Sequence, residues 1–322
     1  FVKHFDNPPL LQLDDSAVVD INDSLPQAVG TRLHPPRLAI STDSYVVSPI
    51  FFPGGDIGKL AVCGTVNDVS MSGAQPLWLS AGFILEEGLP LADLERIVAS
   101  MAATARLAGV QIVTGDTKVV DRGSADRVFI NTAGVGLLPP GVKIAGDQAR
   151  PGDLVLLSGS IGDHGMTIMI QREGLRFDSP LESDCAPLNG LVAGLLAAVP
   201  LGAVRCLRDP TRGGLGPVPI GFQTSTAVGI EVDETAVPVR DAVRGACELL
   251  GLDPLYVANE GKLVAVVEPQ HAGAALQALR AREHGQMAAI IGRVTESHPG
   301  RVILRTALGA RRVVDMLVGE QL

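Results

Sequence analysis

The chain has 322 residues, a length that suits two domains, and it is 46% hydrophobic but only 3% aromatic. Its 37 glycines and 22 prolines indicate a globular α/β protein with many tight turns. The formal net charge of −9 disfavours nucleic acid and membrane surfaces as partners, because an acidic surface repels phosphate backbones and anionic lipids. The charge does not exclude a small anionic ligand, since a local nest of amides or a metal ion can bind one.

The first part of the chain alternates apolar runs with helical patterns. Strands are expected at 37–47, 77–85, 110–115 and 128–138, and helices at 57–73 and 90–109. The second helix has a proline at its start and a glycine at its end, as helices often do. This order favours an α/β domain in which helices pack on a mixed sheet.

A stretch rich in proline and glycine at 138–153 predicts a domain boundary, which divides the chain into residues 1–145 and 146–322. Further strands are expected at 154–159, 228–233, 262–268, 288–294 and 301–315, and helices at 164–172, 186–199, 239–250 and 271–282. The second part is therefore expected to be another α/β or α+β domain.

The cysteine pattern argues against a zinc site or a disulfide framework. Cys63, Cys185, Cys206 and Cys247 form no C-x-x-C pair, and buried thiols in a reducing cytosol are the favoured interpretation. No apolar run reaches membrane-spanning length and no signal peptide is visible, so we expect a cytoplasmic protein. The chain starts at Phe1 without a methionine, and a fragment of a longer product is expected.

The common nucleotide-binding motifs are absent from the sequence. No G-x-G-x-x-G follows a strand, and "PGGDIGKL" at 53–60 lacks the first glycine and the final hydroxyl of a P-loop. Acidic residues instead recur beside small residues at the ends of expected elements. They are Asp43, Asp68 (after Asn67), Asp116, Asp209 and Glu260.

Carboxylates that converge on one place repel one another unless a cation holds them, and hard oxygen ligands suit Mg²⁺. Arg212 with the amides of Gly213 and Gly214 could form an anion cradle, and Lys59 and Lys118 could offer charges to phosphates. Each acidic residue also has a simpler interpretation as a turn, a helix cap or part of a solvated face.

Two further residues are assigned structural roles. His164 stands alone in "GDHG", where capping or packing is favoured over metal binding. Cys63 lies in the middle of an expected helix and is favoured as a core residue over a nucleophile.

Several segments together resemble one family of proteins. "GDTKVV" at 115–120, "SGSIGDHG" at 158–165, "RDPTRGG" at 208–214 and "LYVANEGK" at 255–262 are similar to the hydrogenase maturation factor HypE family. The resemblance runs in order along almost the whole chain. It implies the two-domain PurM-like architecture of the aminoimidazole ribonucleotide synthetase superfamily, which binds ATP through acidic residues rather than a P-loop.

The resemblance also implies an activity. HypE proteins use ATP to dehydrate a thiocarbamate on their own C-terminal cysteine to a thiocyanate, which supplies the cyanide ligands of the [NiFe] hydrogenase iron. It implies HypF as the carbamoyl donor, the HypC–HypD complex as the acceptor and a homodimer formed through the N-terminal sheets. Alternatives are another amide-activating synthetase or kinase of the superfamily, or a catalytically silent nucleotide-binding scaffold.

Site roles carried over from the family fall into three groups. The metal set is Asp43, Asp68, Asp116 and Asp209, and the contacts to ATP come from Lys59, Asn67 and Thr117, beside the cradle of Arg212, Gly213 and Gly214. Glu260 is the expected base and Lys118 the residue that assists it or neutralises charge on the transferred phosphoryl group.

Three departures from the family pattern bear on these expectations. HypE proteins end in Pro-Arg-Ile-Cys, whereas this sequence stops at Leu322, so the chain as given is expected to bind ATP without turnover on itself. The glycine-rich segment expected before Phe1 is missing. Pro217 and Pro219 stand where relatives carry a helix, and an irregular path is expected there because proline disrupts a helix interior.

Overall fold

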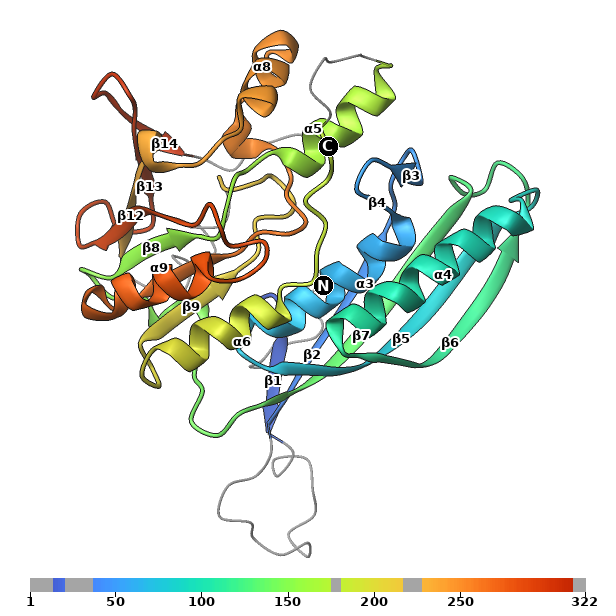
Figure 1. The fold of residues 1–322 in the computed structure, drawn as a ribbon, viewed down its shortest axis with the longest axis horizontal. Helices are drawn as coiled ribbons and strands as arrows, with labels where there is room; N and C mark the ends of the chain where they lie inside the picture. Colours follow the sequence, from blue (N-terminus) through green and yellow to red (C-terminus); the bar gives the residue numbers. More distant parts are fainter. Residues whose placement is uncertain (1–13, 21–36, 175–180, 217–227, 315–322) are drawn as a thin grey trace, which may run out of the picture.

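Two β-sheets organise the chain, one in each half (Figure 1). The computed structural model describes residues 14–20, 37–174, 181–216 and 228–314. The segment with Pro217 and Pro219, for which an irregular path is expected, lies outside the described residues.

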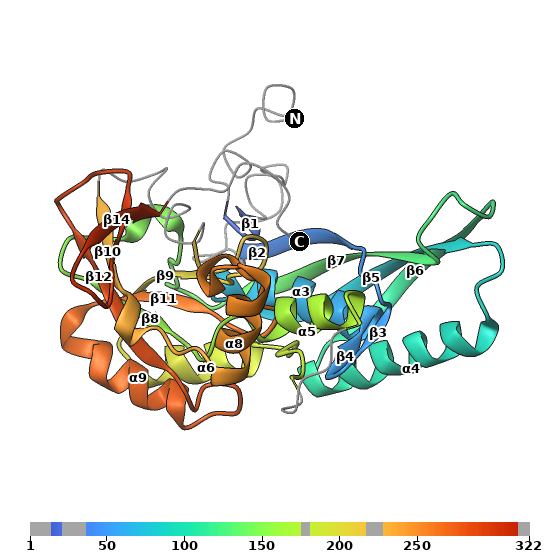
Figure 2. The ribbon, with the colours of Figure 1, turned by 90° about the horizontal axis from the view of Figure 1, so that it is seen from above.

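The first sheet has five strands in the order β1-β2-β7-β5-β6. They are β1 (Ala17–Asp20), β2 (Arg37–Tyr45), β5 (Gln75–Glu86), β6 (Gln111–Val120) and β7 (Val128–Leu138). β5 and β6 run parallel and the other neighbours antiparallel, so the sheet is mixed as expected. Helices α3 (Ile57–Met71) and α4 (Leu91–Ala108) cover one face of it (Figure 2).

Helix α3 is buried along almost its whole length. Asp56 caps its start, where the carboxylate accepts hydrogen bonds from the N–H groups of Gly58 and Lys59. Small residues allow close packing, and a side chain at Gly64 would collide with the ring of Tyr45 from β2. Because α3 lies between the first sheet and the second half of the chain, its polar residues enter the interface between the halves.

The second sheet has seven strands in the order β14-β13-β10-β12-β8-β11-β9. They are β8 (Leu154–Leu157), β9 (Val204–Arg208), β10 (Gly229–Asp233), β11 (Val264–Val267), β12 (Ala289–Thr295), β13 (Val302–Arg305) and β14 (Arg311–Val314). The helices are α5 (Asp163–Arg172), α6 (Asn189–Ala198), α8 (Asp241–Leu250) and α9 (Ala272–Arg280). α6 and α9 share one apolar core, which also takes in side chains of β8 and β11.

Short elements complete the fold. A small hairpin pairs β3 (Phe51–Phe52) with β4 (Gly55–Asp56). Single 3-10 turns lie at Gly146–Gln148, Glu234–Ala236, Pro254–Tyr256 and Pro269–His271. No described helix is both long and apolar enough to span a bilayer.

The expected fold class is confirmed, and most expected helices and strands are present with their ends shifted by a few residues. α6, for example, begins at Asn189 rather than at 186. The strand expected at 301–315 is instead an antiparallel pair, β13 and β14. The sequence pattern missed β1, the hairpin of β3 and β4, and β9. The two halves also pack on each other, because Ile168 and Cys185 of the second half join the apolar core around α3.

Candidate active site

A cleft of about 350 Å³ opens between the two halves of the chain. The end of β2 and one side of α3 line it from the first half, and α5 with residues 209–212 and 258–260 lines it from the second half. Four acidic residues singled out in the sequence meet here: Asp43, Asp68, Asp209 and Glu260. The structure thus brings most of the expected acidic set to one place.

The pKa values of Asp68 and Asp209 are raised well above the ordinary value for aspartate. Burial is the largest cause in both cases, and the nearby carboxylate of Asp15 is the next. The hydroxyl of Ser41 donates a 2.8 Å hydrogen bond to Asp68 Oδ2, which partly opposes the rise for Asp68. These carboxyl groups therefore favour a proton or a cation as a partner.

Asp15 is a member of this cluster that is not among the residues singled out from the sequence. Its carboxylate lies 3.1 Å from Arg208 Nε, and burial together with the charge of Asp14 raises its pKa to about 6 against the pull of Arg208. The pair of adjacent acids just before the apolar residues of β1 was the available signal.

The acidic cleft was tested for its fit to Mg²⁺. Asp15 Oδ2 and Asp209 Oδ2 are buried oxygens without a hydrogen-bond partner among the described residues. In that part of the chain, no three His, Cys, Asp or Glu side chains converge closely enough to hold a metal by themselves. In nucleotide sites Mg²⁺ commonly binds through one or two carboxylates, substrate phosphates and waters. The unpartnered oxygens fit an ion of that kind.

Glu260 lines the same cleft, and its pKa is raised well above the ordinary value. Burial is the main cause, followed by Cys185 and Asp209. Its backbone N–H donates a 3.1 Å hydrogen bond to Asp184 Oδ1, and its carbonyl accepts one of 3.4 Å from Asn67 Nδ2. A carboxylate whose pKa lies nearer neutrality can act as a general base.

Asn67 is 1% exposed and lies in the wall behind Glu260. Its Nδ2 also donates to the carbonyl of Ala186 at 3.1 Å, and its Oδ1 accepts the N–H of Leu188 at 2.7 Å. Contact with nucleotide was expected for this residue. Both ends of its amide bind backbone groups of the second half, and its contact with nucleotide stays a prediction.

Arg212 lies at the mouth of the cleft, where its Nη2 is 3.1 Å from Asp43 Oδ1. Its side chain is 83% exposed, so it is free to move toward an anion. Gly213 and Gly214 have φ angles of +73° and +66°, and they form the tight turn beneath Arg212 without lining the cleft themselves.

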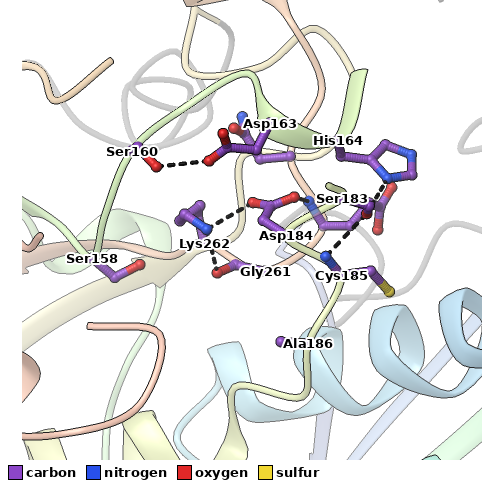
Figure 3. A network of polar contacts seen from close by, with 12 residues as sticks. Ser158, Ser160, Asp163, His164, Ser183, Asp184, Cys185, Ala186, Gly261 and Lys262 are labelled. Carbon is purple, nitrogen blue, oxygen red and sulfur yellow. Dashed lines mark hydrogen bonds and ion pairs between the residues drawn. The ribbon is translucent and has the colours of Figure 1, made fainter. Parts of the chain in front are cut away.

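A second cleft of about 300 Å³ also lies between the halves and contains Lys59. The ammonium of Lys59 donates a 2.8 Å hydrogen bond to the carbonyl of Gly54. Asp184 and Lys262 line this cleft as an ion pair (Figure 3). Lys59 is therefore near the acidic cleft in the fold but lines a different hollow.

Asp116, Thr117 and Lys118 lie on β6, at the edge of the described part of the first sheet, and not in either interdomain cleft. Lys118 Nζ is 3.1 Å from Asp116 Oδ2, and the two side chains are 71% and 69% exposed. The hydrogen bond from Lys118 lowers the pKa of Asp116, as does the one from the N–H of Thr117. A single chain does not bring these residues to Glu260.

His164 has the packing role expected from the sequence. It lies edge-on against the ring of Phe52, and its Nδ1 is 2.8 Å from Ser183 Oγ (Figure 3). Burial lowers its pKa to about 4, so the ring is neutral at physiological pH. Cys63 is likewise buried in the core, as expected.

Two family models match this chain. The N-terminal domain of AIR synthase related proteins matches residues 13–138, and the C-terminal domain matches residues 150–305. The carbamoyl dehydratase HypE of Azotobacter vinelandii is 60% identical over 90% of this chain and 85% of its own length. The chain belongs to the HypE family. HypE of Escherichia coli K12 is 49% identical and aligns with 100% of this chain and 92% of its own length.

Solved HypE structures share the fold. HypE in a HypE–HypF complex superposes with a TM-score of 0.89 at 48% identity, with 98% of each chain covered. A hydrogenase maturation protein HypE in complex with ATP gives a TM-score of 0.85 at 52% identity, with 99% of this chain and 92% of that chain covered. The resemblance to HypE seen in the sequence motifs is thereby confirmed, and the chain is a member of an enzyme family.

Asp184 and Lys262 are polar residues of the HypE chain that sequence patterns did not select. Their positions are separated by a long stretch of chain, and no local motif predicts that they pair. Lys262 does follow the expected base Glu260 by one intervening glycine, which was the only local hint.

Proposed function

We propose that this protein is an ATP-dependent dehydratase that converts a thiocarbamate on a C-terminal cysteine into a thiocyanate. In this proposal the cyanide passes to the iron of a [NiFe] hydrogenase. Support comes from curated relatives that are carbamoyl dehydratases and from a HypE relative solved in complex with ATP.

The observation that carries the proposal is the position of Glu260 in an acidic cleft between the halves. Burial and the neighbouring Cys185 and Asp209 raise its pKa, and a base for proton transfer near neutral pH needs a pKa above the ordinary value for glutamate. The neighbouring aspartates offer the hard oxygen ligands that a nucleotide site without a P-loop needs.

The reaction balances as an amide dehydration driven by ATP. The carbamoyl oxygen attacks the γ-phosphorus, and ADP leaves. The nitrogen then releases one of its two protons to water, which leaves an O-phosphorylated imine. Glu260 accepts the second proton from the nitrogen, the C–O bond breaks with departure of phosphate, and the C≡N bond forms. Thiocarbamate and ATP thus give thiocyanate, ADP, phosphate and a proton. Asp209 is only 7% exposed and Glu260 is half-buried, which supports a site that limits hydrolysis of the phosphorylated intermediate.

The remaining residues bind and orient the triphosphate in this proposal. One or two of Asp43, Asp68 and Asp209, together with the phosphates and waters, would hold Mg²⁺, whose charge neutralises the phosphates. Arg212 at the mouth of the cleft is exposed enough to reach a phosphate, with Gly213 and Gly214 shaping its turn. Lys59 lies in the adjacent cleft and would approach the nucleotide from there.

Asp116, Thr117 and Lys118 enter the proposal through a second copy of the chain. They lie on β6. Trp78 and Ile84 of β5 are 46% and 42% exposed, and the register of β5 with β6 places them on the same face of the sheet as Asp116 and Lys118. In the described part of the chain, no helix covers this face of the sheet (Figure 2). A homodimer through this face would bury the apolar residues and carry Lys118 toward the partner's cleft.

The proposed partners follow from membership of the HypE family. A HypE relative has been solved in a HypE–HypF complex, which supports HypF as the carbamoyl donor. The HypC–HypD complex as acceptor and a cytoplasmic location stay predictions.

The test uses the full gene product, carbamoylated by its HypF partner, and measures its intact mass before and after addition of MgATP. Loss of one water from the C-terminal cysteine peptide is the expected result. ATP consumption without that loss would favour a different synthetase or kinase of the superfamily. Bound ATP without consumption would favour the scaffold alternative and overturn the proposal.

A further inference from the structure

A buried ion pair lies directly behind Glu260 in the wall between the two clefts. Lys262 Nζ donates a 2.9 Å hydrogen bond to Asp184 Oδ2, and the two side chains are only 7% and 5% exposed (Figure 3). Burial alone would raise the pKa of Asp184, but the charge and hydrogen bond of Lys262 bring it below the ordinary value. Asp184 is therefore a carboxylate that is held ionised inside the protein.

The second oxygen of Asp184 serves a different purpose. Its Oδ1 accepts the backbone N–H of Glu260 at 3.1 Å. One carboxylate thus holds both ends of the segment 260–262. The residue between them must be glycine, because a Cβ at Gly261 would collide with the backbone carbonyl of Asp184.

The other side of Glu260 is held from the first half of the chain. Asn67 on α3 donates to the carbonyl of Glu260 at 3.4 Å and to that of Ala186 at 3.1 Å. The N–H of Glu260 is thus held by Asp184 and its carbonyl by Asn67, while its side chain lines the acidic cleft. A buried ion pair is weak evidence for stability, since its desolvation offsets much of the attraction. A positioning role gives this one a reason to be present.

We infer that Asp184, Lys262 and Asn67 are positioning residues that fix the backbone of Glu260 and so aim its carboxylate into the acidic cleft. The inference rests on the proposed function, in which Glu260 is the base. None of the three side chains lines the acidic cleft, so in this inference they act through the backbone of Glu260. Displacement of a reacting group by about 1 Å can slow a reaction by about a hundredfold.

The experiment compares single-turnover dehydration in the full gene product, carbamoylated by its partner, for the wild type, Asp184→Asn and Lys262→Met. Each variant is expected to lower the rate by about tenfold to a hundredfold. The affinity for MgATP and its KM are expected to change by less than about twofold, because neither Asp184 nor Lys262 lines the acidic cleft.

A matched control comes from a second buried carboxylate in the same half. Asp153 is 3% exposed, accepts the N–H of Arg150 at 2.8 Å and lies 3.8 Å from Arg205 Nε. Asp153→Asn is expected to lower the urea midpoint, as Asp184→Asn does, but to leave the dehydration rate unchanged.

A double variant distinguishes a loss of positioning from a loss of folding. Asp184→Asn with Lys262→Met removes both charges, and the asparagine oxygen can still accept the N–H of Glu260. This variant is expected to unfold at a higher urea concentration than Lys262→Met alone and to dehydrate faster, because no charge is left buried without a partner.

Dehydration by Asp184→Asn and Lys262→Met at the wild-type rate would overturn the inference, as would a loss matched by Asp153→Asn. If the wild type itself shows no dehydration, the proposed function fails instead, so the two failures are distinguishable.

Discussion

Glu260 is the residue on which the proposed chemistry depends most directly. Glu260→Gln keeps the shape and the backbone bonds to Asp184 and Asn67 but removes the proton acceptor. We expect dehydration to fall by about 10²- to 10⁴-fold, the usual contribution of a general base, with ATP binding unchanged. Single-turnover mass measurement and calorimetric titration with MgATP check the two parts. Full retained turnover would remove Glu260 from the role of base.

The raised pKa values of the acidic cluster predict how stability changes with pH. A carboxyl group whose pKa is higher in the folded than in the unfolded chain stabilises the fold below its unfolded pKa. This stability is lost as the pH rises through the folded value, about 6 for Asp15. We expect the metal-free protein to lose about 1–3 kcal/mol of unfolding free energy between about pH 5 and pH 7.5. Urea unfolding at both pH values measures it.

Asp209→Asn is the control for this effect. The pKa of Asp209 is raised mainly by burial, and its Oδ2 has no hydrogen-bond partner among the described residues. The variant should therefore lose less stability over the same pH interval than the wild type. An equal loss in both proteins would place the origin of the effect outside the acidic cluster.

At the site, sequence patterns predicted the acidic residues that share a local motif and missed those defined by long-range packing. Asp43, Asp68, Asp209 and Glu260 meet in one cleft because β2, α3, the segment after β9 and residues 258–260 all border the interface between the halves. Asp184 could not be selected, because its importance comes from pairing with Lys262 across the fold. A pairing of this kind leaves no periodicity in the sequence.

Among the elements, the turn at 213–214 is constrained both by the positive φ of Gly214 and by nearby backbone carbonyls. A Cβ at Gly214 would lie 2.6 Å from the carbonyl oxygens of both Leu255 and Val257. Gly251, which ends α8, has a similar φ of +69° but open space around it. Gly251→Ala is expected to lower the unfolding free energy by about 1–2 kcal/mol, the cost of the left-handed conformation.

Gly214→Ala is expected to lower the unfolding free energy by about 3 kcal/mol or more, because backbone carbonyls cannot move aside as side chains can. Urea unfolding of both variants gives the comparison. Equal losses in Gly214→Ala and Gly251→Ala would show that the close carbonyls contribute nothing.

The long elements could be predicted from the sequence because their signals are local. α4 shows helical spacing with a proline before it and a glycine after it, and β7 alternates buried and more exposed residues. β1, β3 and β4 span only two to four residues each, too short for a period to show. β9 lies at the edge of the second sheet and depends on pairing with the distant β11.

For the whole molecule, the separation of Lys118 from Glu260 in one chain leads to a test of the proposed homodimer. Glu260→Gln and Lys118→Met chains are each expected to be inactive. If each site takes Lys118 from the partner, a mixed dimer has one intact site. Random pairing after mixing and reassociation should then restore about a quarter of wild-type turnover.

The control mixture combines Glu260→Gln with Asp209→Asn. Both residues line the cleft of one chain, so every site in the mixed dimer carries one change and no recovery is expected. No recovery in the first mixture, or equal recovery in both, would contradict a site shared between copies.

The amide of Asn67 has a consequence for motion. It joins α3 in the first half to the backbone at Ala186, Leu188 and Glu260 in the second half, and it does so from a buried position. Separation of the two halves would break these three hydrogen bonds inside an apolar interface. We therefore expect the two halves to move as one unit, so that the cleft between them stays formed as ligands enter and leave it.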